Sequence, residues 1–417
     1  MRRWRSKPSL IPLLVLLGWG ASQAAPAELP PAAASPFIIR TWDTDDGLPQ
    51  NSVTAIVQTR DGYLWLGTLN GLVRFDGARF AVFDESNTPG LPSSRIVSLY
   101  EDPSGTLWIG TETGGAAFLQ DGEITSTGLG QGASESRLVA ARADSTGAVW
   151  LNTADGAVWQ RRGRRFIPHL FGHDRPSTLR TLVATVDGEL WVGTDHRLAQ
   201  IGGPGGAAFE LPLLRELEVG RLDFLAARQK GGFWRLADGR IEIWRRGQLE
   251  RDAGPYPWPP GTRVTAASED VSGNLVVGTA GSGLYWFSAD GRVTRLTTRE
   301  GLSHNTVISL CADREGNLWA GTQGGGLNRI KRQVFEVLEE TRGQTVLTVC
   351  EDATGTVWAG TDGEGCGAGI RSAVNASRVA AGSSTPKSSR FGRRCPCRRG
   401  AACWRSRWWL GATLTRA

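Results

Sequence analysis

Histidine has the most versatile side-chain chemistry near neutral pH. His169 and His173 are four residues apart, a spacing that brings two imidazoles to one metal ion when the segment is a helix. Pro168 and Gly172 disfavour a helix there, and no glutamate completes a metalloprotease motif. We therefore expect both histidines in a loop or at a sheet edge, and His304 in a loop.

Aspartate is the next candidate, because carboxylates serve as general acids and bases. Seven aspartates occupy the same position of a repeated motif: Asp61, Asp102, Asp144, Asp187, Asp270, Asp313 and Asp352. A catalytic acid is normally unique in its chain. Recurring aspartates followed closely by glycine are typical of turns, in which the carboxylate binds backbone N–H groups. We predict a structural role for all seven, and no catalytic residue in this chain.

Two short motifs offer ligands for a metal. The segment 43–47 carries carboxylates that suit calcium, but it is too short for an EF-hand loop. Cys395 and Cys397 lack a second pair at zinc-like spacing. We predict no metal site and no cofactor. Cys311 and Cys350 occupy the same phase of adjacent repeats, so we expect small buried strand residues, with a disulfide between them as the alternative.

Irregular loops usually carry the binding residues of a sheet scaffold. The least repetitive segment of the chain is the Pro-rich stretch Gly254–Gly261. Its aromatic residues, Tyr256 and Trp258, are the candidate ligand-binding residues, because aromatic rings stack on sugars or pack against peptides. The alternative is that they cap the adjoining sheets. The ligand itself is expected to be a small molecule of unknown identity, with an oligosaccharide as one candidate.

A repeated sequence must position all of these residues. The pattern Asp-x-(x)-Gly-x-Leu-Trp-x-Gly-Thr occurs eight times. Its tryptophan column is spaced by 39 to 43 residues and comprises Trp65, Trp108, Trp150, Trp191, Trp234, Val276, Trp319 and Trp358. This period is typical of a four-stranded propeller blade. In the first copy we expect strands over 53–58, 63–68, 72–75 and 79–83, separated by Asp-Gly and Asn-Gly turns.

The fold predicted is therefore all-β: a β-propeller over residues 36–365. The tryptophans should fill the wedges between blades, and the glycine two residues after each should permit close backbone approach near the centre. Seven blades plus a partial eighth is the preferred count, because the eighth copy is expected to lack its last two strands. In an eight-bladed ring, the alternative, Phe37–Trp42 would pair with the incomplete last blade.

The opening segment WDTDDGLPQNSV (42–53), followed by DGYLWLGTLNGLVRFDGARF, resembles the two-component regulator propeller repeat. Related segments begin at Gly90 and Gly301. The resemblance implies a periplasmic sensor region, which in such proteins precedes a membrane helix and a histidine kinase or diguanylate cyclase. No kinase or cyclase motif occurs in this sequence, so we expect a truncated parent that was membrane-anchored, with a homodimer as one arrangement.

The two ends of the chain differ from the repeats. Residues 1–24 combine a basic start, a short apolar run and small residues before a cleavage point after Ala24, which predicts a signal peptide and a periplasmic or secreted protein. Residues 366–417 are basic and rich in Cys and Arg, and are expected to be disordered or frame-shifted. The ends carry the basic charge, so the net +6 leaves the repeats acidic, which argues against a nucleic-acid partner.

The sequence thus favours an extracytoplasmic ligand-sensing propeller, the input part of a two-component-type protein, and not an enzyme. A lyase or hydrolase on a propeller scaffold is the first alternative. The second is a non-functional remnant of a disrupted sensor gene.

Overall fold

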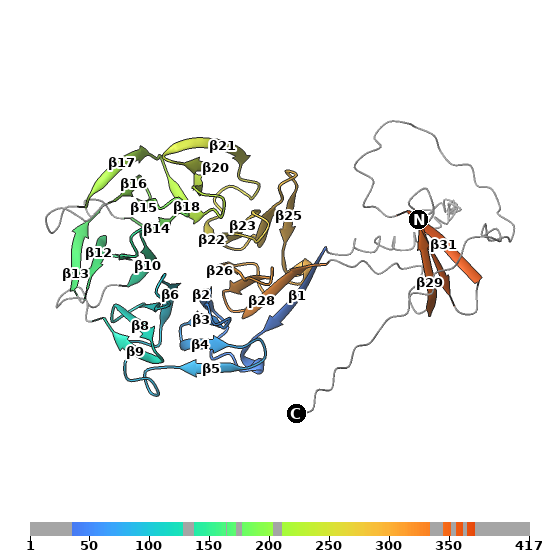
Figure 1. Cartoon of the computed structure of the whole chain (residues 1–417), viewed down its shortest axis with the longest axis horizontal. Helices are drawn as coiled ribbons and strands as arrows, with labels where there is room; N and C mark the ends of the chain where they lie inside the picture. The colour runs from blue at the N-terminus through green and yellow to red at the C-terminus, as the bar shows by residue number, and fades with distance from the viewer. Residues whose placement is uncertain are drawn as a thin grey trace, which may run out of the picture. The chain divides into compact units, whose positions relative to one another are not determined.

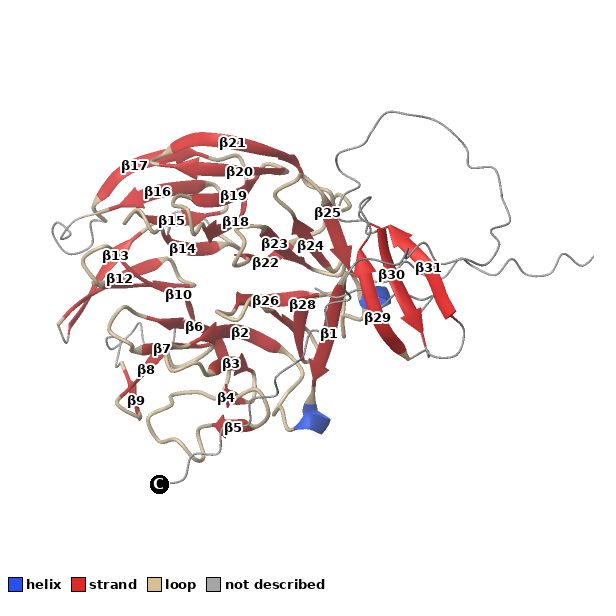
Figure 2. Ribbon diagram, turned by 45° about the vertical axis from the view of Figure 1, so that its right-hand side comes forward, coloured by secondary structure: helices blue, strands red, loops and turns tan. Residues whose placement is uncertain are grey.

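The computed structural model describes residues 36–127, 137–163, 165–171, 177–202, 211–333, 345–351, 356–361 and 365–371. The chain divides into two compact units, Met1–Gln333 and Val334–Ala417. The first contains a ring of seven four-stranded antiparallel sheets, which are the blades of a β-propeller (Figure 1). Almost all of its regular structure is strand (Figure 2). Among the described residues, no helix is long and apolar enough to cross a membrane.

Each of the first three blades takes four consecutive strands from the chain. Blade 1 contains β2 (Val53–Gln58), β3 (Leu64–Thr68), β4 (Gly71–Phe75) and β5 (Phe80–Phe83). Blade 2 contains β6 (Ile96–Glu101), β7 (Leu107–Thr111), β8 (Ala116–Gln120) and β9 (Glu123–Ser126). Blade 3 contains β10 (Leu138–Ala143), β11 (Val149–Thr153), β12 (Ala157–Arg162) and β13 (Arg165–Leu170). The strands of blade 1 agree with the predicted ones to within one residue.

The next three blades repeat this order. Blade 4 contains β14 (Arg180–Ala184), β15 (Leu190–Thr194), β16 (Arg197–Ile201) and β17 (Leu213–Glu218). Blade 5 contains β18 (Leu222–Ala227), β19 (Phe233–Ala237), β20 (Arg240–Arg245) and β21 (Gln248–Pro255). Blade 6 contains β22 (Val264–Glu269), β23 (Leu275–Thr279), β24 (Leu284–Phe287) and β25 (Val293–Leu296). The 3-10 helices η1 (Thr44–Asp46) and η2 (Thr298–Glu300) precede the first strands of blades 1 and 7.

Blade 7 closes the ring with strands from both ends of the propeller. It contains β26 (Val307–Ala312), β27 (Leu318–Thr322) and β28 (Leu327–Arg332), and β1 (Phe37–Trp42) supplies its outer strand. The register pairs Phe37 with Arg332 and Trp42 with Leu327. The prediction of seven blades is therefore confirmed. The N-terminal strand does not pair with the eighth copy, as the eight-bladed alternative required, because β28 offers it a complete antiparallel partner.

The eighth copy of the repeat lies in the second unit as a three-stranded antiparallel sheet. Its strands are β29 (Val346–Glu351), β30 (Thr356–Thr361) and β31 (Gly365–Arg371). The expectation that this copy lacks its last two strands is wrong, because the sheet contains three strands. The third, β31, extends past the predicted limit at residue 365. The repeat pattern of side chains ends at Cys366, but β31 still forms because strand pairing is made by backbone hydrogen bonds. The predicted signal peptide and the segment 372–417 lie outside the described residues.

The core of the propeller consists of seven clusters, each lying between two neighbouring blades. Blades 6 and 7, for example, share a cluster with Trp286, Leu318 and Phe37. The tryptophan column is at most 8% exposed in every described blade. Flat side chains that fill the wedges between twisted sheets were the predicted role of this column, and the structure confirms it.

Candidate functional site

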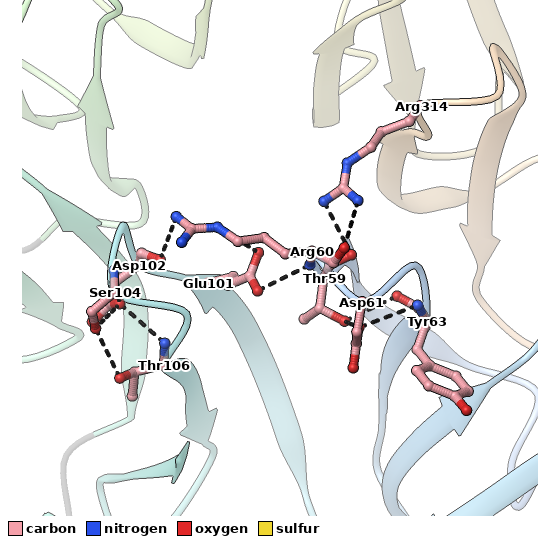
Figure 3. Close-up of polar contacts among 9 residues, drawn as sticks. All are labelled: Thr59, Arg60, Asp61, Tyr63, Glu101, Asp102, Ser104, Thr106 and Arg314. Atoms are coloured by element: carbon pink, nitrogen blue, oxygen red, sulfur yellow. Dashed lines mark hydrogen bonds and ion pairs between the residues drawn. The ribbon is translucent and has the colours of Figure 1, made fainter. Parts of the chain in front are cut away.

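The repeated aspartates hold the turns that surround one mouth of the propeller. The Asp102 carboxylate accepts backbone N–H bonds from Ser104 (2.8 Å) and Thr106 (3.1 Å) (Figure 3). It also accepts a bond from the Trp108 indole at 2.9 Å. Asp144 and Asp313 accept the same indole bond at 2.8 and 2.7 Å. The predicted turn role is confirmed for Asp61, Asp102, Asp144, Asp270 and Asp313, whose carboxylates accept backbone N–H groups of their own turns. The Asp187 carboxylate instead accepts bonds from Gly232 and Arg245 of blade 5, and Asp352 lies outside the described residues. The bond to the core tryptophan is an additional one that the sequence did not indicate.

These hydrogen bonds also change the acidity of Asp102. Burial alone would raise the pKa of its carboxyl group. Donors on Ser104, Trp108 and Thr106 together outweigh burial, and hold that pKa below its usual value of 3.8. Asp102 therefore stays ionised at neutral pH and serves as an acceptor rather than as a proton donor.

The glycine of the repeat lies where neighbouring blades approach most closely. A Cβ on Gly67 would lie 2.9 Å from Ile96 Cγ2 in the next blade, and one on Gly278 would lie 2.9 Å from Val307 Cγ1. A Cβ on Gly321 would overlap the carbonyl oxygen of Val53, across the closure of the ring. The predicted close approach is therefore confirmed at these positions.

Arginines at the same mouth join adjacent blades (Figure 3). The Arg314 guanidinium of blade 7 donates to the carbonyl oxygens of Arg60 (3.0 Å) and Thr59 (3.1 Å) in blade 1. The Arg60 backbone N–H donates to Glu101 of blade 2 at 3.0 Å. The guanidinium groups of Arg60 and Arg314 both contact acceptors within the protein. The arginines at this mouth therefore stabilise the ring.

The inner strands of the seven blades enclose a central cavity of about 460 Å³. Each of these strands is paired on one side only, so alternate backbone N–H and C=O groups point away from the partner strand. The side chains of the lining are mostly short or apolar, such as Ala140, Ser98, Ile308 and Leu225. The cavity therefore offers hydrogen-bonding strand edges between mostly short or apolar side chains, and is the candidate functional site.

One cation in this lining has no acidic partner among the described residues. Arg142, on β10, donates through Nη1 to the carbonyl oxygen of Ala141 at 2.7 Å. Its guanidinium lies 5.3 Å from the ring centroid of Tyr100 on the neighbouring blade. Burial lowers the pKa of Arg142, and burial also raises the pKa of Tyr100. The Tyr100 hydroxyl accepts the N–H of Ala143 at 3.0 Å, which fixes the ring beneath the cation.

The other charged groups of the lining are already compensated. Glu269 accepts bonds from the Trp234 indole (3.1 Å) and the Gln229 N–H (2.6 Å), and Arg228 lies 3.7 Å away. Arg180 donates to the carbonyl oxygen of Ala154 at 2.9 Å. Arg142 is thus the lining group with the largest unused capacity for an anion.

The two residues proposed from the sequence as ligand contacts lie elsewhere. Trp258 is only 5% exposed and belongs to the cluster between blades 5 and 6, where Tyr256 stacks on it at 4.5 Å. The Tyr256 hydroxyl donates to Asp223 at 2.9 Å. Burial and the Asp223 carboxylate raise the pKa of Tyr256. The structure places both rings as packing between blades, the alternative that the sequence left open.

The structure also shows where the candidate histidine, cysteine and calcium-binding residues lie. His169 lies on β13, the outer edge strand of blade 3, and is fully buried; His173 falls outside the described residues. Cys311 is a partly buried strand residue whose pKa burial raises to about 11. Asp43 and Asp46 form the capping box of η1, so the segment 43–47 is a turn.

Sequence reasoning missed Arg142, although a signal was present. Arg142 pairs with Trp150 in the register, and the same register position in blades 1, 2, 4, 5, 6 and 7 holds Val57, Tyr100, Val183, Ala226, Ser268 and Cys311. Alignment of the inner strands on the tryptophan column would have shown Arg142 as the one cation in that row.

Comparison with known proteins agrees with the propeller fold. The profile of the family described as "Two component regulator propeller" matches residues 47–70, 90–113 and 301–324. The second residue of each segment is a leucine, which is buried between blades: Leu48, Leu91 and Leu302. A curated relative, histidine kinase P4 of Formosa agariphila, is 42% identical over 52 residues, which make up 12% of this chain and 4% of that protein.

Solved structures show the same fold at low sequence identity. The extracellular domain of the hybrid two-component system BT3049 of B. thetaiotaomicron matches with a TM-score of 0.56 and 18% identity, over 79% of this chain and 47% of that one. The structure titled "Streptogramin B lyase structure" matches with a TM-score of 0.58 and 14% identity, over 71% of this chain and 98% of that one. The chain is thus a seven-bladed β-propeller that carries the two-component regulator propeller repeat.

Proposed function

We propose that this chain is an extracytoplasmic ligand-sensing propeller, the input part of a two-component-type signalling protein whose output domain lies on a longer parent. The observation that carries this proposal is the repeat itself, because its family profile matches in three blades of the ring. The similarity to extracellular domains of B. thetaiotaomicron two-component systems supports the location. A signal peptide over residues 1–24 is part of the proposal.

The chemistry of the site also supports binding rather than catalysis. In blades 2, 3 and 7 the aspartate and the tryptophan of the repeat are engaged with each other. The cavity presents one uncompensated cation and strand edges, which are recognition groups. The lyase structures share the fold at 14% identity or less, and fold alone does not carry an activity.

A thermal-shift screen of the full chain tests the proposal. A ligand that binds the folded ring and not the unfolded chain raises the melting temperature by mass action. Oligosaccharides, peptides and small organic anions form the panel. A compound that raises the melting temperature with a saturable dose response supports a sensor. Turnover of a panel compound without any stabilising ligand would overturn the proposal in favour of an enzyme.

A further inference from the structure

The Arg142 guanidinium has more N–H donors than its contacts with the described residues use. An arginine carries five N–H donors in a planar fork, and the contacts of Arg142 comprise one bond to Ala141 and the face of Tyr100. Among the described residues no carboxylate forms an ion pair with it. The other arginine of the cavity lining, Arg180, donates to two backbone carbonyl oxygens.

A half-buried cation without a counter-charge is unfavourable, because burial removes water from the charged form. The direction of the Arg142 pKa reflects this, since burial lowers it. Tyr100 and Ala141 hold the guanidinium in place from two sides. A planar fork fixed in this way is arranged for an anion with two oxygens in one plane.

The surroundings of Arg142 define the rest of the ligand. The cavity of about 460 Å³ is within the size range of small-molecule sites. The inner strand edges offer alternating hydrogen-bond donors and acceptors. Hydroxyl groups on a ligand can bond to both, because a hydroxyl both donates and accepts. Glu269, also in the lining, is already bonded to Trp234 and Gln229, so that carboxylate does not require a cationic group on the ligand.

We propose that the central channel is a binding site for a small hydroxylated carboxylate, whose carboxylate pairs with the Arg142 guanidinium and whose hydroxyl groups bind the inner strand edges. This inference rests on the proposed sensor function and deepens it, because it names the class of ligand and the residue that recognises it.

Calorimetric titration of the full chain with D-glucuronate tests the inference. D-Glucose is the matched neutral probe, since it has the same ring without the carboxylate, and inorganic phosphate is the matched anion without the ring. The variants are Arg142→Gln, which removes the charge, and Arg142→Lys, which keeps the charge but removes the fork. Arg161→Gln is the control, because Arg161 also lies over aromatic rings, at 5.1 Å from Trp108, but on β12 outside the cavity.

The expected result is binding of one D-glucuronate per chain, weakened about tenfold or more by Arg142→Gln, weakened less by Arg142→Lys, and unchanged by Arg161→Gln. D-Glucose should bind more weakly than D-glucuronate to the unaltered chain. Tighter binding of phosphate than of D-glucuronate would overturn the class of ligand. Absence of D-glucuronate binding up to about 10 mM, or binding that Arg142→Gln leaves unchanged, would overturn the site.

A second measurement remains informative if Arg142→Gln fails to fold. In the unaltered chain labelled with [15N]arginine, D-glucuronate should shift one guanidinium Nε–H resonance, and Arg142→Lys should abolish that resonance. Shifts of other arginine resonances only would overturn the inference. A ligand from the thermal-shift screen that binds the chain without shifting the Arg142 resonance would overturn the channel site and leave the proposed sensor function standing.

Discussion

The Trp286 indole, on the third strand of blade 6, donates a hydrogen bond to the Asp270 carboxylate at 3.0 Å. In blades 2, 3 and 7 this bond comes from the tryptophan on the second strand of the blade. Blade 6 has Val276 at that position, and the register places Trp286 directly opposite it. The bond between aspartate and indole is therefore retained where the repeat has lost its tryptophan.

The bond to Asp270 should stabilise blade 6 measurably. Trp286→Phe removes the donor, and Trp258→Phe is the matched control, because the buried Trp258 indole has no hydrogen-bond partner among the described residues. A hydrogen bond to a charged group contributes about 2 kcal/mol, so Trp286→Phe should lower the free energy of unfolding by about 2 kcal/mol more than the control. Urea denaturation measures the difference, and equal losses would contradict the role of the bond.

Ring closure should be sensitive to Gly321. Gly321→Ala forces a Cβ against the Val53 carbonyl oxygen of blade 1 and should lower the free energy of unfolding by about 3 kcal/mol. Gly324→Ala is the control, since Gly324 has a φ of +88° but nothing within 4 Å; its loss should be about 1 kcal/mol. If urea denaturation gives the two variants equal stability, close approach is not what selects glycine at position 321.

The N-terminal strand should be required for a closed ring. A chain that begins at Asp43 lacks β1, whose Phe37 contacts Trp286 and whose Trp42 contacts Trp319. It leaves β28 as an unpaired edge, and such edges promote aggregation. Size-exclusion chromatography with light scattering should show aggregation for this chain and not for one that begins at Pro36. A monodisperse, cooperatively unfolding product that begins at Asp43 would contradict the observed closure.

Acid should weaken the turns in which aspartate is the acceptor. The pKa of Asp102 is lower in the folded chain than its ordinary value of 3.8, so ionised Asp102 contributes stability above about pH 4 that is lost as the pH falls through the folded pKa. Asp102→Asn should lower stability at pH 7 and flatten its decline below pH 4. Urea midpoints between about pH 7 and 2.5 measure this, with the exposed Asp290→Asn as control. A parallel decline in the unaltered and Asp102→Asn chains would argue against it.

The sequence predicted the blades because their determinants are local. An aspartate and a glycine form most of the turns, and a large flat side chain fills most of the wedges, so Asp313 and Trp319 have the same roles as Asp102 and Trp108. The partner of Phe37–Trp42 was left open because the seventh and eighth copies have similar strands. Only closure of the ring selects β28.

The site was less accessible from sequence for a different reason. Recognition of Arg142 requires knowledge of which strand of each blade faces the axis and which of its residues line the cavity. The Pro-rich loop predicts Trp258 as a ligand contact, because such loops are often exposed. Its burial against Tyr285 at 5.3 Å follows from a tertiary contact that no local pattern encodes.

We propose that the ring binds a ligand without transforming it. The most direct measurement is mass spectrometry of a compound that raises the melting temperature, after incubation with the full chain. We expect the compound to be recovered chemically unchanged. Conversion of the compound at a rate proportional to the concentration of the chain would contradict the claim and identify the propeller as an enzyme.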